Sequence, residues 1–96
     1  MIVEFGDEAT EDIFHGENSK AARRLPATVW SAARRKLDLL NAAHAMQDLA
    51  SPPGNRLEAL KGALAGRHSI RVNDQFRIVF TWAEGNAHDV RISDYH

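Results

Sequence analysis

Apolar and polar side chains alternate along Gln75-Phe76-Arg77-Ile78-Val79-Phe80-Thr81-Trp82, with Val79 as the exception. A period of two residues is typical of a β-strand that has one face in the core and the other face outside it. The same period recurs in residues 68–73 and 87–93, and turn sequences rich in Asn, Asp and Gly separate the three runs. The sequence therefore predicts an antiparallel meander of three strands, to which a short N-terminal strand over residues 2–5 can be added.

The segments before the meander have the period of helices instead. Apolar residues about 3.6 positions apart predict a long helix from Ala27 to Leu49, which the prolines and glycine of residues 51–55 end. A short N-capped helix is expected from Asp7 to His15, and a single helical turn from Ala21 to Leu25. Helices first and sheet last indicate an α+β domain of two layers, with the N-terminal strand and helices packed on a C-terminal antiparallel sheet. Residues 1–96 are expected to form this single domain.

The alternation also divides the side chains between two faces of the sheet. One face is apolar and is expected to pack against the helices: Ile70, Val72, Phe76, Ile78, Phe80, Trp82, Val90 and Ile92. The opposite face carries Arg71, Arg77, Arg91 and Tyr95. Such a face is either a solvated surface or a platform for phosphate groups, since guanidinium is permanently charged and suited to bidentate contacts with phosphate. We favour the platform, because crowded Arg side chains repel one another without an anionic partner.

The last three residues, Asp94-Tyr95-His96, bring together a carboxylate, a phenol and an imidazole. Each can move a proton, and an imidazole does so near neutral pH. Metal-free cleavage of RNA needs a base for the ribose 2′-hydroxyl, a cation for the charged transition state and an acid for the leaving oxygen. Stacking on an RNA base is an alternative role for Tyr95. The candidate proton carriers are Asp94, Tyr95, His96 and Lys61, and the candidate cations are Arg71 and Arg77.

Composition excludes several other classes of protein. The chain has no cysteine, so disulfides, thiolate metal sites and cysteine nucleophiles are excluded. Its five histidines are not clustered, so we expect no metal site, and it has no glycine-rich phosphate loop. The start of the chain does not read as a signal peptide, and no apolar run approaches the roughly 20 residues of a membrane helix. These features predict a cytoplasmic protein with no membrane anchor.

Charge is distributed unevenly, although the net charge is only −1. The first 17 residues contain six acidic residues and neither Lys nor Arg, whereas five of the seven charged residues from Arg56 to Arg77 are basic. Binding through charge is therefore expected on local surfaces rather than over the whole protein. The acidic N-terminal part is a candidate binding surface separate from the basic face.

Three segments carry a further, combined pattern: residues 57–62 (LEALKG), residues 68–78 (HSIRVNDQFRI) and the terminal Asp94-Tyr95-His96. Together they resemble the HigB group of toxins in the RelE/ParE superfamily of bacterial toxin–antitoxin systems, and the resemblance extends over nearly the whole chain. It implies a ribosome-dependent endoribonuclease that enters the A site of the 70S ribosome and cuts mRNA without a cofactor. It also implies a HigA-like helix-turn-helix antitoxin as the partner, with operator DNA bound only through that antitoxin.

The resemblance also implies roles for particular residues. Arg77 would stabilise charge on the phosphate, Lys61 would be a supporting cation or proton carrier, and Asp94-Tyr95-His96 would be the terminal catalytic group. The residues expected to bind RNA are Arg56, Arg67, Arg71, Asn73 and Arg91. Glu58 stands where some members of the family have a histidine. Its role stays open between a base, a residue that orients Lys61 or Arg77, and no role at all.

Two other functions stay open from the sequence. The superfamily includes toxins that poison DNA gyrase without cleaving RNA, so a shared fold does not decide between the activities. A gyrase poison has no need for an Asp-Tyr-His ending, which favours the ribonuclease. The remaining alternative is an inactive module that binds antitoxin or operator DNA.

Overall fold

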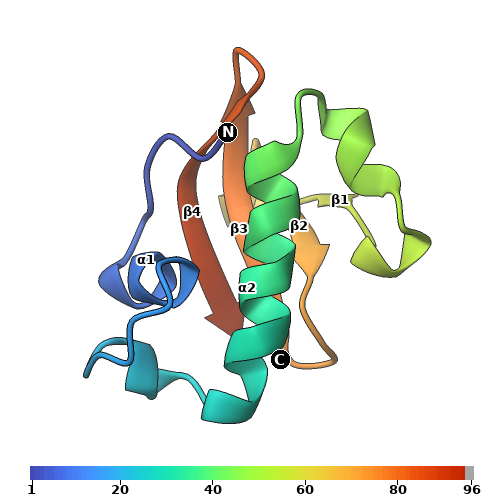
Figure 1. Ribbon diagram of the computed structural model, residues 1–96. Helices are drawn as coiled ribbons and strands as arrows, with labels where there is room; N and C mark the ends of the chain where they lie inside the picture. The colour runs from blue at the N-terminus through green and yellow to red at the C-terminus, as the bar shows by residue number, and fades with distance from the viewer. Residues whose placement is uncertain (95–96) are drawn as a thin grey trace.

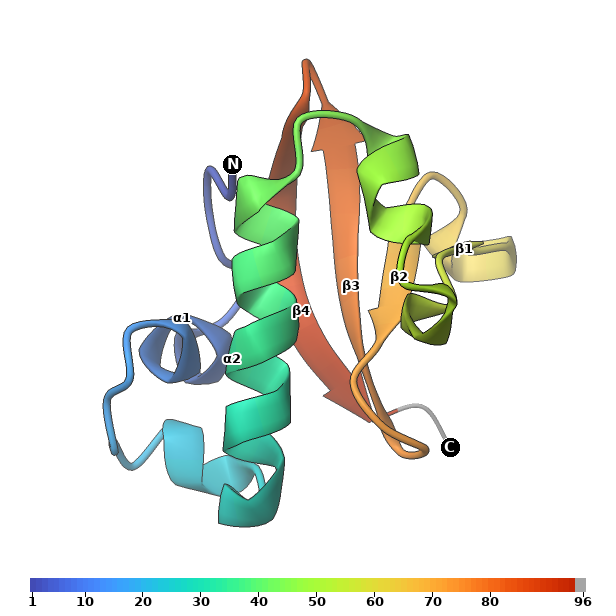
Figure 2. The same ribbon diagram turned by 45° about the vertical axis from the view of Figure 1, so that its right-hand side comes forward.

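The structure, a computed structural model, describes residues 1–94. In these residues two α-helices, α1 (Glu8–Phe14) and α2 (Ala27–Ala42), precede an antiparallel sheet of four strands. The strands lie side by side in chain order: β1 (Glu58–Ala59), β2 (His68–Arg71), β3 (Phe76–Ala83) and β4 (Asn86–Asp94). Helix α2 lies across one face of the sheet, with α1 to one side of it (Figure 1 and Figure 2). This arrangement confirms the predicted two-layer α+β architecture.

Short 3₁₀ helices occur in the connections: η1 (Ala22–Arg24), η2 (Met46–Ala50), η3 (Pro53–Asn55) and η4 (Gly62–Leu64). The first of them confirms the helical turn predicted before Pro26. None of the helices within residues 1–94 is long and apolar enough to cross a membrane.

Helix α1 has the ends that its sequence predicts. The Asp7 carboxylate accepts a hydrogen bond from the Thr10 N–H at 2.8 Å, which satisfies one of the free donors of the first turn. Glu8 and Glu11 in the first turn interact favourably with the helix dipole. Gly16 follows the helix with φ +75°, a conformation that glycine adopts without steric cost.

Helix α2 ends at Ala42, so the prediction that it continues to Leu49 was wrong. The Asp48 carboxylate accepts hydrogen bonds at 3.0 Å from the backbone N–H groups of His44 and Ala45. These hydrogen bonds lower the pKa of Asp48. They also cap the N-terminus of η2, which follows in place of a continued α2. A side chain that binds these N–H groups competes with the continuing helix, and helical periodicity alone does not reveal that competition.

The core lies between α2 and the sheet. The predicted stripe of α2 is buried through Val29, Ala33, Leu37 and Leu40. On the sheet, the predicted inward side chains are buried as well, except for Trp82, which is partly buried and packs against the core. The alternation therefore identified the inner face correctly.

The N-terminal segment runs beside β4 without forming a regular strand. Ile2 and Phe5 make isolated parallel bridges to Ala87 and Val90. The prediction of a strand over residues 2–5 was wrong in that respect, because a β-bulge in β4 lies between the two bridges and interrupts the pairing. The fourth strand of the sheet is β1 instead, in a segment that was predicted to be a connection.

Candidate active site

The centre of the candidate site is Arg77, on the face of the sheet opposite α2, here called the outer face. The residue is only 7% exposed. Nε donates a hydrogen bond to the Ser69 hydroxyl at 2.7 Å, and Nη2 donates to the Arg56 carbonyl at 2.5 Å. Ser69 is fully buried. The guanidinium is therefore held in one orientation before any ligand binds, as required of a preorganised cation.

The Arg56 carbonyl reaches Arg77 because the chain turns sharply after η3. Arg56 has φ +45°, in the left-handed region. The preceding Asn55 is fully buried, and its amide donates to the carbonyls of Leu49 and Ser51 at 3.2 and 3.3 Å. These bonds fix the turn that presents the carbonyl.

Lys36 of α2 connects the turn at Asn55 and Arg56 to the helix layer. Its ammonium group donates to the Asn55 side-chain oxygen. Burial lowers the pKa of Lys36, and the neighbouring cations Arg35 and Arg71 lower it further. This contact links α2 through Asn55 to the backbone that binds Arg77.

Glu58 belongs to the outer face because its partner across the β1–β2 ladder is Ser69. Its carboxylate lies 3.7 Å from Nη1 of Arg77, an ion-pair distance that is longer than a hydrogen bond. The Glu58 side chain is 51% exposed. Of the three roles left open from the sequence, the geometry agrees with an electrostatic partner of Arg77 and leaves the carboxylate accessible.

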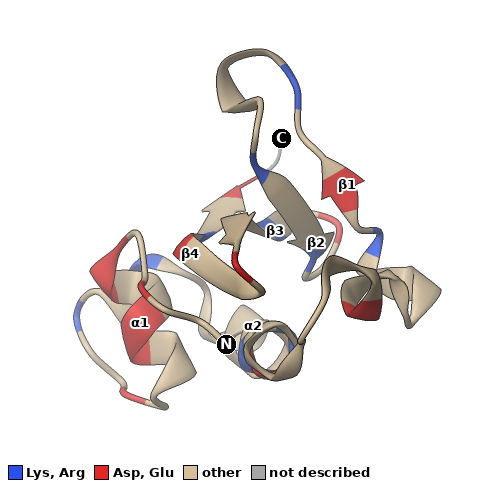
Figure 3. Ribbon diagram, turned by 90° about the horizontal axis from the view of Figure 1, so that it is seen from above, with Lys and Arg blue, Asp and Glu red and all other residues tan. Residues whose placement is uncertain are grey.

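Lys61 is the N-cap residue of η4, in the segment that connects β1 to β2. Seen from above, this connection projects from the side of the sheet opposite α2 (Figure 3). Lys61 is exposed, and within residues 1–94 its ammonium group has no ion-pair partner. The structure therefore places Lys61 on the side of the sheet that carries Arg77, in an accessible position.

Most of the expected RNA-binding arginines have acidic partners within the chain. Arg67 pairs with Asp89 at 2.6 Å, Arg91 pairs with Asp89 at 3.1 Å, and Arg71 pairs with Asp74. The argument that crowded arginines require an external anion was therefore wrong, because these carboxylates already compensate part of the positive charge. Arg56 is exposed.

Asn73 has a structural role in the turn between β2 and β3. Its side-chain oxygen accepts hydrogen bonds from the N–H groups of Gln75 and Phe76, at 2.9 and 2.7 Å. This is the geometry of an Asx turn, which fully accounts for an Asn at this position.

Asp94 lies at the end of β4 and accepts a hydrogen bond from the Gln75 amide at 3.0 Å. Its partner in the ladder is Phe76, whereas Ser93 is the partner of Arg77. Cross-strand partners share a face, so the alternation places Asp94 toward the α2 side rather than on the outer face. Tyr95 and His96, the other members of the predicted terminal group, lie outside the described residues.

Two residues of the site were missed from the sequence. In the sequence Ser69 is only one polar position of the alternating run 68–73, and no pattern singles out Asp89. The alternation that assigns Arg77 to the outer face, together with strand pairing, was the available signal for Ser69. Asp89 gave no such signal, because its position depends on a bulge. Within residues 1–94, no group of three or more His, Asp or Glu residues is placed to hold a metal ion.

Comparisons with known proteins give a consistent result. Residues 3–96 match a family model described as the RelE-like toxin of the type II toxin–antitoxin system HigB. The chain is 46% identical over 87 residues to Toxin HigB-1 of Vibrio cholerae, covering 91% of this chain and 90% of the relative. It is 31% identical over 72 residues to an uncharacterized protein of Haemophilus influenzae, covering 75% and 71% of the two chains. A solved structure, a YoeB–YefM complex from Staphylococcus aureus, has a similar fold, with a TM-score of 0.56, 20% identity and coverage of 96% of this chain and 92% of that one.

Proposed function

The chain belongs to the HigB family of RelE-like toxins of type II toxin–antitoxin systems, and from this membership we propose that it is a ribosome-dependent endoribonuclease. The substrate is mRNA in the ribosomal A site, and no cofactor takes part. The observation that carries the proposal is the fixed guanidinium of Arg77, with the accessible carboxylate of Glu58 3.7 Å from it. A toxin that acts only by binding a protein has no need for a preorganised cation of this kind.

The proposed reaction is an in-line transesterification. The ribose 2′-oxygen attacks the adjacent phosphorus, a base takes the 2′-hydroxyl proton, and the bond from phosphorus to the 5′-oxygen breaks as an acid protonates that oxygen. Arg77 stabilises the negative charge that develops on the phosphate oxygens. Lys61, Tyr95 and His96 are the proposed proton carriers, and Glu58 is the electrostatic partner of Arg77. Asp94, which the pairing with Phe76 directs toward the α2 side, takes no direct part in this step.

The test is primer extension on cellular mRNA after brief induction of the wild-type chain, Arg77→Gln and His96→Ala. We expect new 5′ ends inside translated codons for the wild type and at least about 100-fold fewer for either variant. Arg24→Gln, which changes an exposed arginine at a distance from the sheet, is the matched control and should cleave normally. The folding of each variant is checked by circular dichroism.

Each alternative has its own outcome in this experiment. Growth arrest with intact mRNA would contradict ribonuclease activity and indicate a protein target such as DNA gyrase. Normal growth with intact mRNA would indicate an inactive module that binds antitoxin or operator DNA. Undiminished cleavage by both variants would contradict the proposed site.

As a type II toxin the protein has an antitoxin as its partner. We propose that a HigA-like helix-turn-helix antitoxin contacts the acidic surface at α1, where Glu8 and Glu11 are exposed (Figure 3). The double change Glu8→Lys and Glu11→Lys should weaken antitoxin binding by at least about 10-fold, through repulsion of a basic partner surface. Asp12 is left unchanged because it accepts a hydrogen bond from Ser19 at 2.6 Å. Unchanged affinity in calorimetry would indicate that the antitoxin covers the outer face instead.

A further inference from the structure

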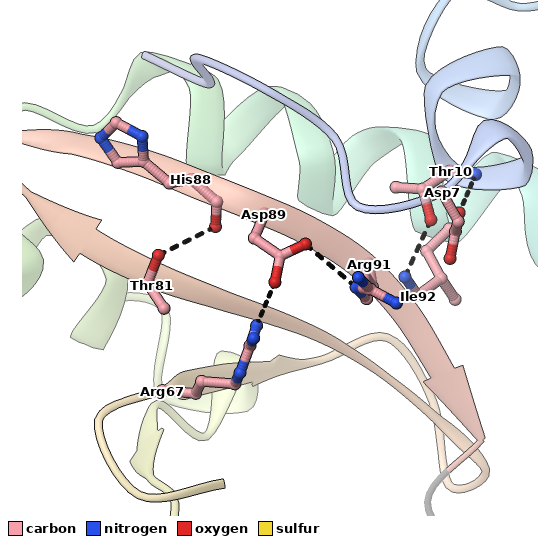
Figure 4. A network of polar contacts seen from close by, with 8 residues as sticks. All are labelled: Asp7, Thr10, Arg67, Thr81, His88, Asp89, Arg91 and Ile92. Carbon is pink, nitrogen blue, oxygen red and sulfur yellow. Dashed lines mark hydrogen bonds and ion pairs between the residues drawn. The ribbon is translucent and has the colours of Figure 1, made fainter.

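A second polar network on the outer face is centred on Asp89 of β4 (Figure 4). One oxygen of its carboxylate lies 2.6 Å from Nη1 of Arg67, and the other accepts a hydrogen bond from Nε of Arg91 at 3.1 Å. The bond from Arg67 is the main reason why the pKa of Asp89 is lowered, and Asp89 therefore stays ionised at neutral pH. The proposed reaction assigns no role to this carboxylate.

A bulge in the backbone of β4 places Asp89 in this network. Pairing between β3 and β4 changes register between Val79 and Thr81, and Asp89 lies in the resulting bulge with φ +52°. Asp and Asn tolerate this left-handed conformation better than most residues do. The N-terminal segment also leaves room for the network, since a Cβ on Gly6 would lie 2.3 Å from both the Asp89 carboxylate and Nε of Arg91.

Arg67 is the last residue of the connection that carries Lys61. Its carbonyl accepts a hydrogen bond from the Leu60 N–H at 2.8 Å, and its own N–H donates to the Leu64 carbonyl at 3.1 Å. These bonds close the base of a loop over residues 61–66, here called the Lys61 loop. Every residue of this loop is exposed, and a Cβ on Gly62 or Gly66 would meet nothing within 4 Å. The loop therefore does not pack on the core, and its orientation depends on the contacts at its base.

The Arg67–Asp89 pair supplies a contact that crosses the sheet. Arg67 adjoins β2 and Asp89 is on β4, so the side chain of Arg67 passes over β3, as Figure 4 shows. The charged atoms of this ion pair lie 2.6 Å apart and both side chains are partly buried, so the pair is screened by solvent less than a fully exposed one. It joins the base of the Lys61 loop to the strand at the far side of the outer face.

We propose that Asp89 is a positioning residue, which holds the Lys61 loop over the outer face through its ion pair with Arg67. The consequence for catalysis rests on the proposed function, in which Lys61 acts on the RNA. A loop held in one orientation presents Lys61 to the phosphate beside Arg77 without first having to be ordered. Without the pair, Lys61 remains in the chain but occupies the productive position for a smaller fraction of the time.

The loop itself is tested by limited proteolysis with trypsin, which cuts after Lys61. Asp89→Asn suits this test because Asn tolerates the left-handed backbone and keeps the size of the side chain while removing its charge. We expect Asp89→Asn and Arg67→Gln each to be cut after Lys61 at least about three times faster than the wild type, since cleavage follows the population of open loop. Asp38→Asn, an exposed change on α2, is the matched control and should be cut at the wild-type rate. Equal rates for all chains would overturn the proposal.

The link to Lys61 is tested by a double-mutant cycle in mRNA cleavage on purified ribosomes. We expect Asp89→Asn to lower the rate at saturating ribosomes about 10-fold and to leave half-saturation within about twofold. In a Lys61→Ala background the same change should alter the rate by less than about twofold, because the group being positioned is gone. Equal effects in both backgrounds would overturn the positioning of Lys61 and leave only a structural role for Asp89.

The two experiments separate failure of this inference from failure of the proposed function. A wild-type chain that does not cleave mRNA on the ribosome would contradict the proposed function, and the trypsin rates would then decide on their own whether Asp89 holds the loop. Faster trypsin cleavage in the variants would support the positioning of the loop in that case, and unchanged rates would reject it.

Discussion

Arg77 and Lys61 are the two catalytic cations proposed within the described residues, and the chain holds them in opposite ways. Arg77 is 7% exposed and is bound to a buried hydroxyl and a backbone carbonyl. Lys61 projects from a loop in which every residue is exposed. A buried cation is fixed by contacts that also stabilise the fold, whereas an exposed one is placed by distant contacts that contribute little to stability. Activity and stability should therefore change together at Arg77 and separately at Lys61.

The largest effect is expected for Arg77→Ala. Removal of the guanidinium leaves the buried Ser69 hydroxyl and the Arg56 carbonyl without the donor that Arg77 supplies. We therefore expect a loss of about 1–3 kcal/mol in the free energy of unfolding. Cleavage should fall by about 10²–10³-fold at the same time. Arg77→Lys is the matched variant, because Lys keeps the charge but cannot reproduce the forked contacts. Urea denaturation measures the stability, and an unchanged midpoint for Arg77→Ala would remove the contrast with Lys61.

A smaller effect, confined to activity, is expected for Lys61→Ala. The side chain is exposed and has no ion-pair partner within residues 1–94, so the free energy of unfolding should change by less than about 0.5 kcal/mol. The cleavage rate on ribosomes should fall by about 100-fold if the ammonium group carries a proton or stabilises charge. A destabilised Lys61→Ala chain would show that the loop contributes to the fold, contrary to its exposure.

The face that carries Arg77 was predictable from the sequence, whereas its burial and the contacts that fix it were not. The alternation around Phe76 and Ile78 places Arg77 on the outer face, and that placement follows from the period of two alone. The turn at Arg56, which supplies the carbonyl, depends on a left-handed residue and a buried Asn55 that no periodicity reveals. The periodicity of a sequence predicts which face of a strand a residue occupies, but it does not predict contacts between segments that are distant in the chain.

The same limit explains the other differences from the predictions. The strand β1 has only two residues and no pattern of its own, and its pairing with β2 exists because the loop closes between Leu60 and Arg67. The bulge at Asp89 shifts the alternation of β4, so that Ala87 and Val90, three residues apart, are both fully buried. Val79 breaks the alternation of β3 in sequence, yet it keeps its outer-face register opposite Ser69 and Arg91 and is 4% exposed. Each of these features depends on tertiary pairing rather than on local sequence.

The smallest effect concerns how pH acts on the contact that positions Lys61. The pKa of Asp89 lies below its ordinary value of 3.8 in the folded chain, mainly because of Arg67, so the ionised carboxylate stabilises the fold. This contribution is complete above the unfolded-state pKa and is lost as the pH falls through the lower folded-state pKa. The stability difference between wild type and Asp89→Asn should therefore shrink as the pH is lowered from about 6 to about 3. Urea denaturation across this range measures it, and in an Arg67→Gln background the pH-dependent part should be smaller. A stability difference that stays constant with pH would show that the Arg67–Asp89 pair contributes nothing through its charge. The pair would then not hold the Lys61 loop by electrostatic attraction.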